Sequence, residues 1–541
     1  MHLGLDFDNT LACYDRSFIQ AAKQRDLLPR GWGGGKRALR DFLRDQGEDG
    51  ELVWQTLQGR VYGELMPQAL LKSGVGWFLL RCKARGIRLS IVSHKTEYSP
   101  KDSKRVPLRE VAREWMEQMG FFDPDRYAIS PDAVHFESTR HEKVERIRTL
   151  KCTHFIDDLS EVLNHHEFPI ETEKILYDPE LKAHGLTESV SIYSNWRSIG
   201  ETLLGPETDA DLVAVTQDLL PNFDVRGCQP IVGGVNSKVY KISFAEEPAV
   251  ALKRYSEAPN YDRDRLGAEV GACRLLRDHG IHQVPAIIHE DKFNQIGIFE
   301  WIEGDPLHNP TSENLLQLLR FVAKLNKLKE STAAKRLPYA TEACLSGQEI
   351  CRQIKIRRDR LDQLKIESSG LSSFLESIFD PLFPRVADWA KRQWPQNQSF
   401  DEVLPVERQT LSPSDLGFHN AIIEGSGTLR VIDLEYFGWD DPVKMASDFW
   451  WHPGMVLDHQ LRRRWITEVT DIFHQDETFG TRLRAAHPLY GLRWAMIVLK
   501  PFLSIETTHK EPATVLQGQL RKSTDLCRDV IRWMEDGNPT F

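Results

Sequence analysis

The sequence predicts an α/β protein with a parallel sheet and a small helical cap in its first part, followed by a two-lobed α+β part. In the first 200 residues, short apolar runs alternate with amphipathic helical patterns; the runs are LGLDF, GIRLSIVSH and THFIDDL. Apolar runs separated by helices are typical of parallel strands that are covered on both faces. After residue 213 the pattern changes to two adjacent strands, SKVYKISF and AVALKRY, and then mainly to helices from Asn309 onward.

These patterns also predict the domain boundaries. The chain has 541 residues, enough for three or four units of about 150 residues. We expect a first domain at 1–205, with a cap at about 14–71, because that mostly helical stretch is too long for an ordinary loop. A Gly-Pro pair and three acids predict a linker at 206–212. The second domain would run to residue 541, with a small lobe at 213–304 and a large lobe at 305–541.

The composition indicates the class of protein and of partner. Hydrophobic residues make up 41% and charged residues 27%, and the net charge is −10. This charge opposes general binding to nucleic acid or anionic membranes, so we expect small-molecule partners. The first residues, MHLGLDFDNT, lack a secretory signal, and the eight cysteines form no C-x-x-C pair. We therefore expect a cytoplasmic protein without disulfides, and nothing in the sequence indicates its oligomeric state.

A first group of polar residues follows the expected parallel strands. Asp6, Asp8 and Thr10 come directly after the first apolar run. Strand ends of an open parallel sheet form its active crevice, where one carboxylate could attack phosphorus while the other moves a proton. Alone, the D-x-D-x-T pattern is a weak signal, because acid-rich turns after strands are common.

Three further elements occur in order along the same segment. Ser93 ends the second run, where it could bind a phosphoryl oxygen or simply cap a helix. Lys143 follows the capping box Thr139-x-x-Glu142, on a helix whose buried stripe is Val144, Ile147 and Leu150; the alternative is an exposed surface lysine. Adjacent acids at a third strand end, Asp157 and Asp158, suit a hard cation.

Residues 1 to about 200 thus resemble the haloacid dehalogenase superfamily of phosphatases, with its Rossmann-like parallel sheet. The resemblance implies an aspartyl-phosphate intermediate. Asp6 would attack, Asp8 would protonate the leaving group and then activate water, and Ser93 and Lys143 would hold the phosphoryl group. It also implies Mg²⁺ between Asp6, the carbonyl of Asp8 and the acids at 157 and 158. The second acid of the first motif favours a phosphatase over a dehalogenase.

A second group of residues begins between the two adjacent strands of the later part. The connecting segment has a glycine pair that would let backbone N–H groups approach phosphates, although a hairpin without a ligand is the alternative. Lys253 on the next strand and Glu269 on the next helix could form a kinase-type ion pair, although either alone could be a surface charge. The nucleotide-contacting residues expected in the connecting segment are Gly233, Gly234, Asn236 and Ser237.

The decisive spacing lies further along the chain. Asp415 and Asn420 have the D-x-x-x-x-N spacing of a kinase catalytic loop, and the strand LRVID ends at Asp433. This half resembles the aminoglycoside phosphotransferase and choline kinase branch of the protein-kinase-like fold. The resemblance implies Asp415 as catalytic base, Asn420 and Asp433 as Mg²⁺ ligands, and ATP as phosphoryl donor, with Lys253 clamping phosphates. In the hinge-like segment IFEWIEG, the backbones of Glu300 and Ile302 would meet adenine.

Two features depart from familiar motifs. The family usually reads His-Gly-Asp before the base, whereas this chain reads Pro413-Ser414-Asp415, so a brace of the loop is missing. The segment around Lys36 looks like a Walker loop but lacks its first glycine and its final Ser or Thr, which favours a turn of the cap.

Together the two groups predict a bifunctional enzyme that removes a phosphate from one position of a small hydroxylated metabolite and adds one elsewhere. We expect a sugar of surface-polysaccharide supply, an interpretation that depends only on the pairing of the two sites. Two alternatives stay open. One is nucleic-acid end healing by a 3′-phosphatase and a 5′-kinase, which the missing Walker loop disfavours. The other is a phosphatase regulated by a nucleotide-sensing pseudokinase, which the Pro413 departure permits.

Overall fold

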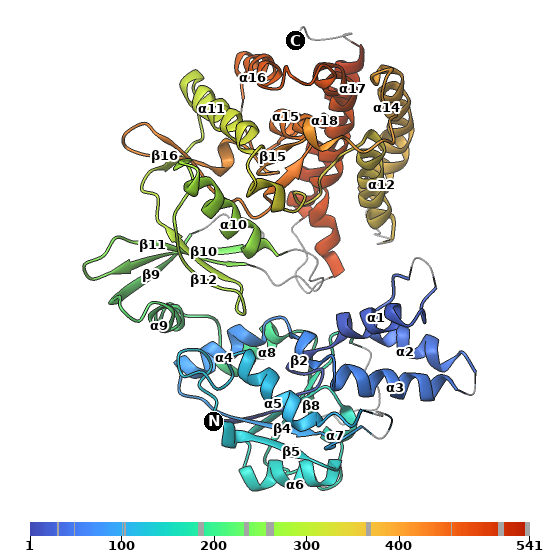
Figure 1. Ribbon diagram of the computed structural model, residues 1–541, viewed down its shortest axis with the longest axis vertical. Coiled ribbons are helices and arrows are strands. Elements are labelled where there is room, and N and C mark those ends of the chain that lie inside the picture. Colours follow the sequence, from blue (N-terminus) through green and yellow to red (C-terminus); the bar gives the residue numbers. More distant parts are fainter. Residues whose placement is uncertain are drawn as a thin grey trace. The chain divides into compact units, whose positions relative to one another are not determined.

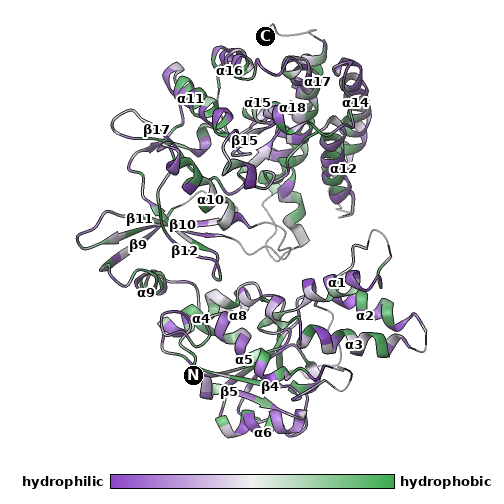
Figure 2. Cartoon of the chain, viewed as in Figure 1, coloured by the Kyte–Doolittle hydropathy of each residue, from purple (hydrophilic) through white to green (hydrophobic). Residues whose placement is uncertain are grey.

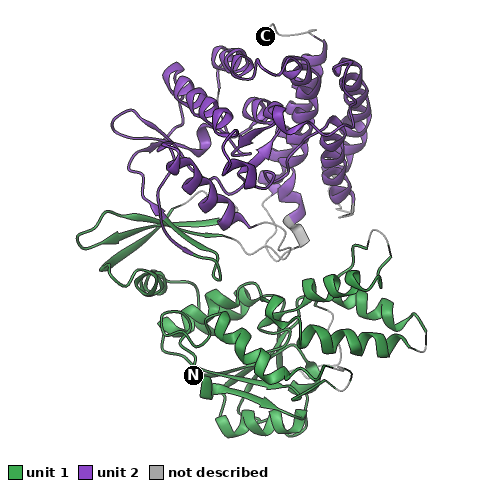
Figure 3. Cartoon of the chain, viewed as in Figure 1, with its two compact units in different colours: residues 1–261, 291–298 green, residues 262–290, 299–541 purple. Residues whose placement is uncertain are grey.

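The computed structural model divides the chain into two compact units, which we describe separately (Figure 3). Unit 1 comprises Met1–Tyr261 and Asp291–Ile298, and unit 2 comprises Asp262–Glu290 and Phe299–Phe541. The residues that the structure describes are 1–29, 32–47, 49–99, 101, 104–181, 189–231, 237–255, 264–363, 369–455, 457–506 and 513–535.

Unit 1 contains the parallel sheet that the sequence predicts. Its order is β5-β4-β1-β6-β7-β8, and every neighbouring pair is parallel (Figure 1). The strands are β1 (His2–Leu5), β4 (Arg88–His94), β5 (Val134–Glu137), β6 (His154–Asp157), β7 (Glu173–Tyr177) and β8 (Val190–Tyr193). The central strands β1, β4 and β6 are the three apolar runs of the sequence, so this prediction is confirmed.

Both faces of this sheet are buried, which explains why its strands are apolar runs rather than alternating patterns. The neighbours Phe155 and Ile156 on β6 pack into two different hydrophobic clusters, as do Ile175 and Leu176 on β7. One cluster includes residues of α4 (Val75–Ala84), α5 (Leu108–Gln118) and α8 (Trp196–Leu204); the other includes residues of α6 (Arg140–Leu150) and α7 (Ser160–Leu163). Figure 2 shows hydrophobic residues along β4 and β5 and hydrophilic ones on α6.

Three helices occupy the stretch that the sequence predicts as a cap. They are α1 (Asp15–Gln24), α2 (Lys36–Arg44) and α3 (Gly50–Tyr62). The stretch leaves and rejoins the α/β part through a short antiparallel pair, β2 (Ala12–Cys13) and β3 (Leu70–Leu71). The pair ties both ends of the insertion to the segment that follows β1, next to Asp6 and Asp8.

The expected linker is not an extended connection. Its last four residues begin α9 (Asp209–Leu219), because Thr208 and Asp211 form a capping box. The carboxylate of Asp211 accepts from Arg81 Nε at 3.2 Å and from Arg85 Nε at 2.6 Å, and its side chain is only 2% exposed. The compact units also group the strands after α9 with the N-terminal sheet, so the domain boundary at 206–212 remains a prediction.

The second sheet confirms the predicted pair of antiparallel strands. Its order is β12-β13-β11-β10-β9, with β9 (Val225–Ile231), β10 (Ser237–Phe244), β11 (Val250–Tyr255), β12 (Ile287–Asp291) and β13 (Ile296–Glu300). Tyr240, Ile242 and Phe244 alternate along β10 as buried residues, which is the period-two pattern of a strand with one covered face.

Unit 2 is mainly helical, as the sequence predicts for the large lobe. Its helices are α10 (Arg265–Asp278), α11 (Ser312–Leu328), α12 (Gly347–Gln363), α13 (Ser369–Phe374), α14 (Asp380–Gln393), α15 (Pro442–Trp451), α16 (His459–Ile472), α17 (Phe479–Ile497) and α18 (Ala513–Glu535). Five short strands accompany them: β14 (Asp305–Pro306), β15 (Thr410–Ser412), β16 (Ala421–Ile423), β17 (Leu429–Val431) and β18 (Gly438–Asp440). Helix α17 is buried along most of its length between α12, α14, α15 and α18.

Two further observations concern the surroundings of the protein. Among the described helices, none combines the length and the apolar character that a membrane crossing requires. All eight cysteines carry free thiols. The cytoplasmic location stays a prediction.

We predict that Asp211→Asn destabilises unit 1, since it leaves two arginines without their shared carboxylate. The two arginines hold the pKa of Asp211 at about 2, although burial opposes this. A carboxyl whose pKa is lowered in the folded state stabilises above its unfolded pKa, and this is lost as pH falls from about 4 toward 2. Denaturant unfolding at pH 7 should show a loss of about 2–3 kcal/mol that shrinks below pH 4.

Asp218→Asn is the matched control, because Asp218 lies on the same helix and pairs with Lys83 at 2.8 Å while 33% of its side chain is exposed. It should cost less than about 1 kcal/mol. Equal losses of stability in the two variants would show that the buried contacts of Asp211 stabilise the fold no more than the exposed ion pair of Asp218.

Candidate active sites

The three central strands of the parallel sheet bring the first group of residues together. Asp6 follows β1, Ser93 lies near the end of β4, and Asp157 ends β6. Because β4, β1 and β6 are parallel neighbours, their carboxyl ends meet at one edge of the sheet. Ser93 Oγ donates to Asp6 Oδ1 at 3.1 Å, and Thr10 Oγ1 donates to Asp6 Oδ2 at 3.2 Å.

Lys143 is the cation of this site. Its Nζ donates to Asp6 Oδ1 at 2.6 Å and to Asp157 Oδ2 at 2.7 Å, and 1% of its side chain is exposed. Burial alone would lower the pKa of Lys143, but the carboxylates of Asp157 and Asp6 raise it above its ordinary value. The capping box of Thr139 and Glu142 is present as predicted and starts α6 so that Lys143 lies in its first turn. The alternative of an exposed surface lysine is excluded.

Three carboxylates form a candidate cation site beside Lys143. Oxygens of Asp6, Asp157 and Asp158 all lie within 4.8 Å of one another. Burial and the neighbouring carboxylates raise the pKa of Asp158 well above its usual range, and burial likewise raises that of Asp157. Carboxylate oxygens crowded in this way are the donors that Mg²⁺ prefers, so the residues present fit the ion that the sequence implies.

The side chain of Asp8 does not join this cluster. Both of its oxygens accept from Lys95 Nζ at 3.0 Å, and Oδ1 accepts from Tyr14 Oη at 2.5 Å. Sequence reasoning missed Lys95, although it lies two residues after Ser93 at the same strand end. It also set Lys36 aside as part of a turn, whereas Lys36 begins α2 of the cap and its Nζ donates to Asn9 Oδ1.

The second group of residues is distributed over both units. In unit 1, Ser237 begins β10 and pairs with Tyr255 across the strands, while Lys253 is buried on β11 with its Nζ 4.9 Å from the centre of the Tyr255 ring. Glu269 belongs to unit 2, so its ion pair with Lys253 remains a prediction. Gly233, Gly234 and Asn236 lie outside the described residues.

Short strands of unit 2 place the expected base and the metal ligands. Asp415 lies in the loop after β15, and Asn420 Nδ2 donates to its backbone carbonyl at 3.0 Å. The pairing of β16 with β17 continues in a bond from Ile432 N to Asn420 O at 3.0 Å, which brings Asn420 beside Asp433. Asp433 itself has a left-handed backbone with φ of 64°, a conformation that is uncommon for a residue with a Cβ and is frequent at functional sites.

Two acids accompany Asp433 as candidate metal ligands. Oxygens of Glu269, Asp433 and Glu435 lie within 4.8 Å of one another, and Glu269 Oε1 accepts from the backbone N–H of Leu434 at 3.3 Å. Sequence reasoning missed Glu435, although its spacing two residues after Asp433 was a signal. In the expected hinge, Glu300 N donates to Ala286 O at 2.8 Å, so a contact with a base would come from the Glu300 carbonyl.

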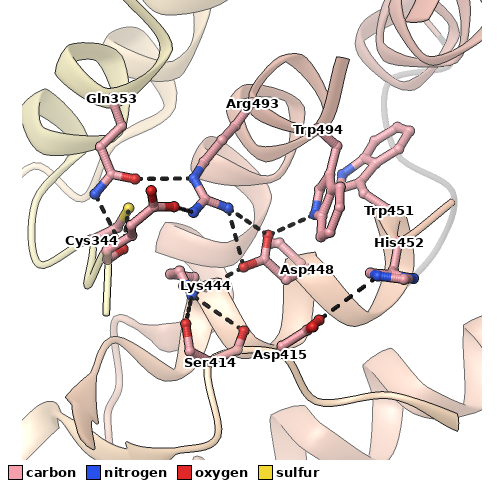
Figure 4. Close-up of polar contacts among 12 residues, drawn as sticks. Cys344, Gln353, Ser414, Asp415, Lys444, Asp448, Trp451, His452, Arg493 and Trp494 are labelled. Atoms are coloured by element: carbon pink, nitrogen blue, oxygen red, sulfur yellow. Dashed lines mark hydrogen bonds and ion pairs between the residues drawn. The ribbon is translucent and has the colours of Figure 1, made fainter. Parts of the chain in front are cut away.

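Lys444 braces the loop that carries Asp415 (Figure 4). Its Nζ donates to Ser414 Oγ at 2.8 Å and lies 3.2 Å from both Asp440 Oδ2 and Asp448 Oδ2. Although burial opposes it, the two carboxylates raise the pKa of Lys444 above its ordinary value, so the buried amine stays charged. Ser414 has a left-handed φ of 67° and also donates to Thr341 O at 3.1 Å. Lys444 thus restrains the loop that lacks the usual histidine.

Two stacked histidines face the carboxylate of Asp415. His419 Nε2 donates to Asp415 Oδ1 at 3.1 Å, and the ring of His452 stacks on that of His419 with centroids 3.8 Å apart. Although burial alone would raise it, the histidines hold the pKa of Asp415 at about 2. Burial lowers the pKa of His452 to about 4, so this ring is neutral at pH 7.

The tautomer of His452 follows from its other nitrogen. Nδ1 accepts from the backbone N–H of Gly454 at 3.1 Å, so the proton is on Nε2, which lies 3.8 Å from Asp415 Oδ1. The neighbouring loop also depends on a glycine: a Cβ at Gly417 would lie 2.5 Å from the His419 ring. Sequence reasoning gave neither histidine a role toward Asp415.

Comparison with protein families matches residues 227–485 to the phosphotransferase enzyme family. The match spans β9 to the first third of α17 and includes Lys253, Asp415, Asn420, Asp433 and Lys444. It does not extend to the N-terminal parallel sheet. Among curated proteins no match was found.

Several solved structures resemble the chain. A spectinomycin phosphotransferase in complex with ADP and spectinomycin is 14% identical, with a TM-score of 0.46 over 60% of this chain and 99% of that one. A choline kinase from Streptococcus pneumoniae is 15% identical, with a TM-score of 0.41 over 58% of this chain and 98% of that one. A choline kinase from Cryptosporidium parvum is 14% identical, with a TM-score of 0.39 over 58% and 89%.

We predict that Lys444→Met loosens the loop around Asp415. The substitution keeps the length of the side chain but leaves the carboxylates of Asp440 and Asp448 buried without their cation, which costs about 3–5 kcal/mol. Native-state hydrogen exchange should become faster at the amides of 411–420 before global unfolding sets in.

Lys335→Met serves as the control, because Lys335 is exposed. It should leave both stability and exchange unchanged. Unaltered exchange at 411–420 in a folded Lys444→Met protein would contradict the bracing role.

Proposed function

We propose that this chain, whose residues 227–485 form a phosphotransferase-family domain, is a bifunctional enzyme that transfers phosphate from ATP to a small hydroxylated molecule and also hydrolyses a phosphate ester. The transferase activity has the stronger support, because the family match and the placement of Asp415, Asn420 and Asp433 agree. The hydrolase activity is carried by one observation, the convergence of Asp6, Ser93 and Lys143 at one edge of the parallel sheet.

In the transferase, Asp415 would accept the proton of the acceptor hydroxyl while that oxygen attacks the γ-phosphorus of ATP. A base is useful only when ionised, and the low pKa of Asp415 keeps it so throughout the physiological range. His419 would orient the carboxylate through its hydrogen bond to Oδ1. Asn420 and the acids around Asp433 would hold Mg²⁺, which balances the negative charge of the phosphates.

In the hydrolase, Asp6 would attack phosphorus and form an acyl phosphate, which water then cleaves. Lys143 and Ser93 both donate to Asp6 Oδ1, so they lie where they could bind the phosphoryl oxygens as well. Mg²⁺ held by Asp6, Asp157 and Asp158 would offset the repulsion between the attacking carboxylate and the phosphate. Asp8 would exchange a proton with the leaving group, and Lys95 and Tyr14 fix its position.

A sugar or sugar phosphate is the substrate class that we propose, because one such molecule can lose a phosphate at one carbon and gain it at another. The pseudokinase alternative has less support, because Lys444 restrains the loop in which Pro413 stands at the usual position of histidine. End healing of nucleic acid stays the weaker alternative because of the net charge of −10.

The test is a pair of variants assayed for both reactions. Asp6→Asn should abolish phosphatase activity on pooled sugar phosphates and leave ATP-dependent transfer intact, because an amide cannot form the acyl phosphate. Asp415→Asn should lower kcat for transfer by a factor of at least about 100 with nucleotide affinity kept. Each variant is thus the control for the other.

Transfer unchanged in Asp415→Asn, or hydrolysis within tenfold of wild type in Asp6→Asn, would contradict the corresponding assignment. Loss of both reactions in either variant would contradict the separation of the two sites.

Binding of Mg²⁺ at the first site can be followed without any activity. Saturating Mg²⁺ should raise the melting temperature of unit 1, as any ligand of the native state does. At a hundredfold excess over Kd, the ion would add about 3 kcal/mol to the free energy of unfolding. Without the ion, Asp158→Asn should be more stable than wild type, because three crowded carboxyl groups become two. Mg²⁺ should then raise the melting temperature of this variant by less than that of wild type.

Glu161→Gln, an exposed acid three residues away, is the matched control and should respond to Mg²⁺ as wild type does. An equal Mg²⁺ response in Asp158→Asn would remove Asp158 from the ion site.

A further inference from the structure

A cavity of about 310 Å³ in unit 1 has no role in either proposed reaction. Its volume lies at the lower end of the range for small-molecule sites. Helices α4 and α8 form one wall, and strands β10 and β11 form the other. The lining residues are Ser73, Gly74, Trp77, Phe78, Arg81, Trp196, Arg197, Gly200, Glu201, Glu207, Lys238, Arg254 and Tyr255.

Positive charge predominates around this cavity. Glu207 faces two cations, Arg254 at 2.6 Å and Lys238 at 3.3 Å, and so compensates only one of them. Asp211 likewise faces both Arg81 and Arg85. Among the lining residues themselves, the four cations Arg81, Arg197, Lys238 and Arg254 meet the two carboxylates Glu201 and Glu207, which leaves two positive charges in excess. An anionic group on a ligand would therefore be attracted here.

Aromatic rings supply the apolar part of the lining. The guanidinium of Arg254 lies 3.9 Å from the centre of the Trp77 ring, which holds that half-buried indole in place. Phe78 and Tyr255 are buried in the two walls. Flat rings and sugar rings both pack well against such surfaces. The combination suits a molecule that carries both a ring and a negative charge.

The walls of the cavity include sequence neighbours of one motif from each proposed site. The indole Nε1 of Trp196 donates to the backbone carbonyl of Thr10 at 3.1 Å, in the loop that carries Asp6 and Asp8. On the opposite wall, Arg254 and Tyr255 directly follow Lys253 on β11. A ligand in the cavity would therefore contact residues that adjoin a motif of each site.

We propose that this cavity binds a phosphate monoester that carries a ring, with the phosphate near Lys238 and Arg254 and the ring near Trp77. The shared chemistry fits a sugar phosphate as well as a nucleoside monophosphate. Neither Asp6 nor Asp415 is among the lining residues, and neither proposed activity is needed to detect binding.

The test is calorimetric titration of the full chain, without divalent ions, with three probes: glucose 6-phosphate, AMP and inorganic phosphate. At least one ester should bind more tightly than inorganic phosphate, because only the esters offer a ring to the aromatic wall. Tighter binding of glucose 6-phosphate would indicate a sugar phosphate as the ligand, and tighter binding of AMP would indicate a nucleoside monophosphate. No binding by either ester, or equal binding of all three probes, would overturn the proposal.

Two variants then place the binding in this cavity. Lys238→Gln removes an exposed excess cation and should weaken binding of the ester about tenfold. Gly200→Leu fills the cavity instead: a Cβ at Gly200 lies 3.5 Å from Phe78 and 3.7 Å from Arg81, an ordinary contact distance, so the backbone accepts a side chain there. This variant should abolish binding without a change of charge.

Lys241→Gln, on the same strand but outside the lining, is the matched control and should bind as wild type does. Circular dichroism confirms that each variant is folded. Affinity within twofold of wild type in either cavity variant, or an equal loss in Lys241→Gln, overturns the proposal.

Discussion

A fully buried lysine bound to two carboxylates holds the reactive loop in each candidate site. Lys143 joins Asp6 to Asp157, and Lys444 joins Asp440 to Asp448; each lysine side chain is 1% exposed. Removing such charges from water is costly unless they are paired and hydrogen-bonded, so each arrangement constrains the backbone around it. In the first site the carboxylate itself is the proposed nucleophile. In the second, Lys444 acts through Ser414, one residue before the proposed base.

The loop that contains Pro413 is held by a residue outside it. The brace of the loop is supplied by α15, whose buried lysine binds both the loop and the acids on either side of it. Asp448 is in turn held by Trp494 Nε1 at 2.8 Å and by Arg493, which also pairs with Glu342 at 2.8 Å (Figure 4). A network that connects α15 and α17 therefore restrains the loop before Asp415.

The sequence predicted what depends on short spacing. The parallel strands, the antiparallel pair and the capping box at Thr139 are local patterns, and the structure has each of them. It also brings Asp6, Ser93 and Lys143 together, because strand ends of a parallel sheet must meet. The sequence did not predict the roles of Lys444, His452 or Lys95, because the partners of these residues depend on how distant helices and loops pack. The helix that begins within the expected linker was missed, because the breaker residues before it drew attention away from the cap at Thr208.

Chemical trapping tests most directly the claim that Asp6, one of the two carboxylates bound by Lys143, is the residue that reacts. The full chain would be incubated with Mg²⁺ and a hydrolysable phosphate ester, quenched in acid and reduced with borohydride, which converts an aspartyl phosphate to homoserine. Peptide mass spectrometry then locates the converted residue. The account predicts homoserine at position 6 alone. Hydrolysis without conversion there, or conversion at Asp8, Asp157 or Asp158 instead, would contradict it.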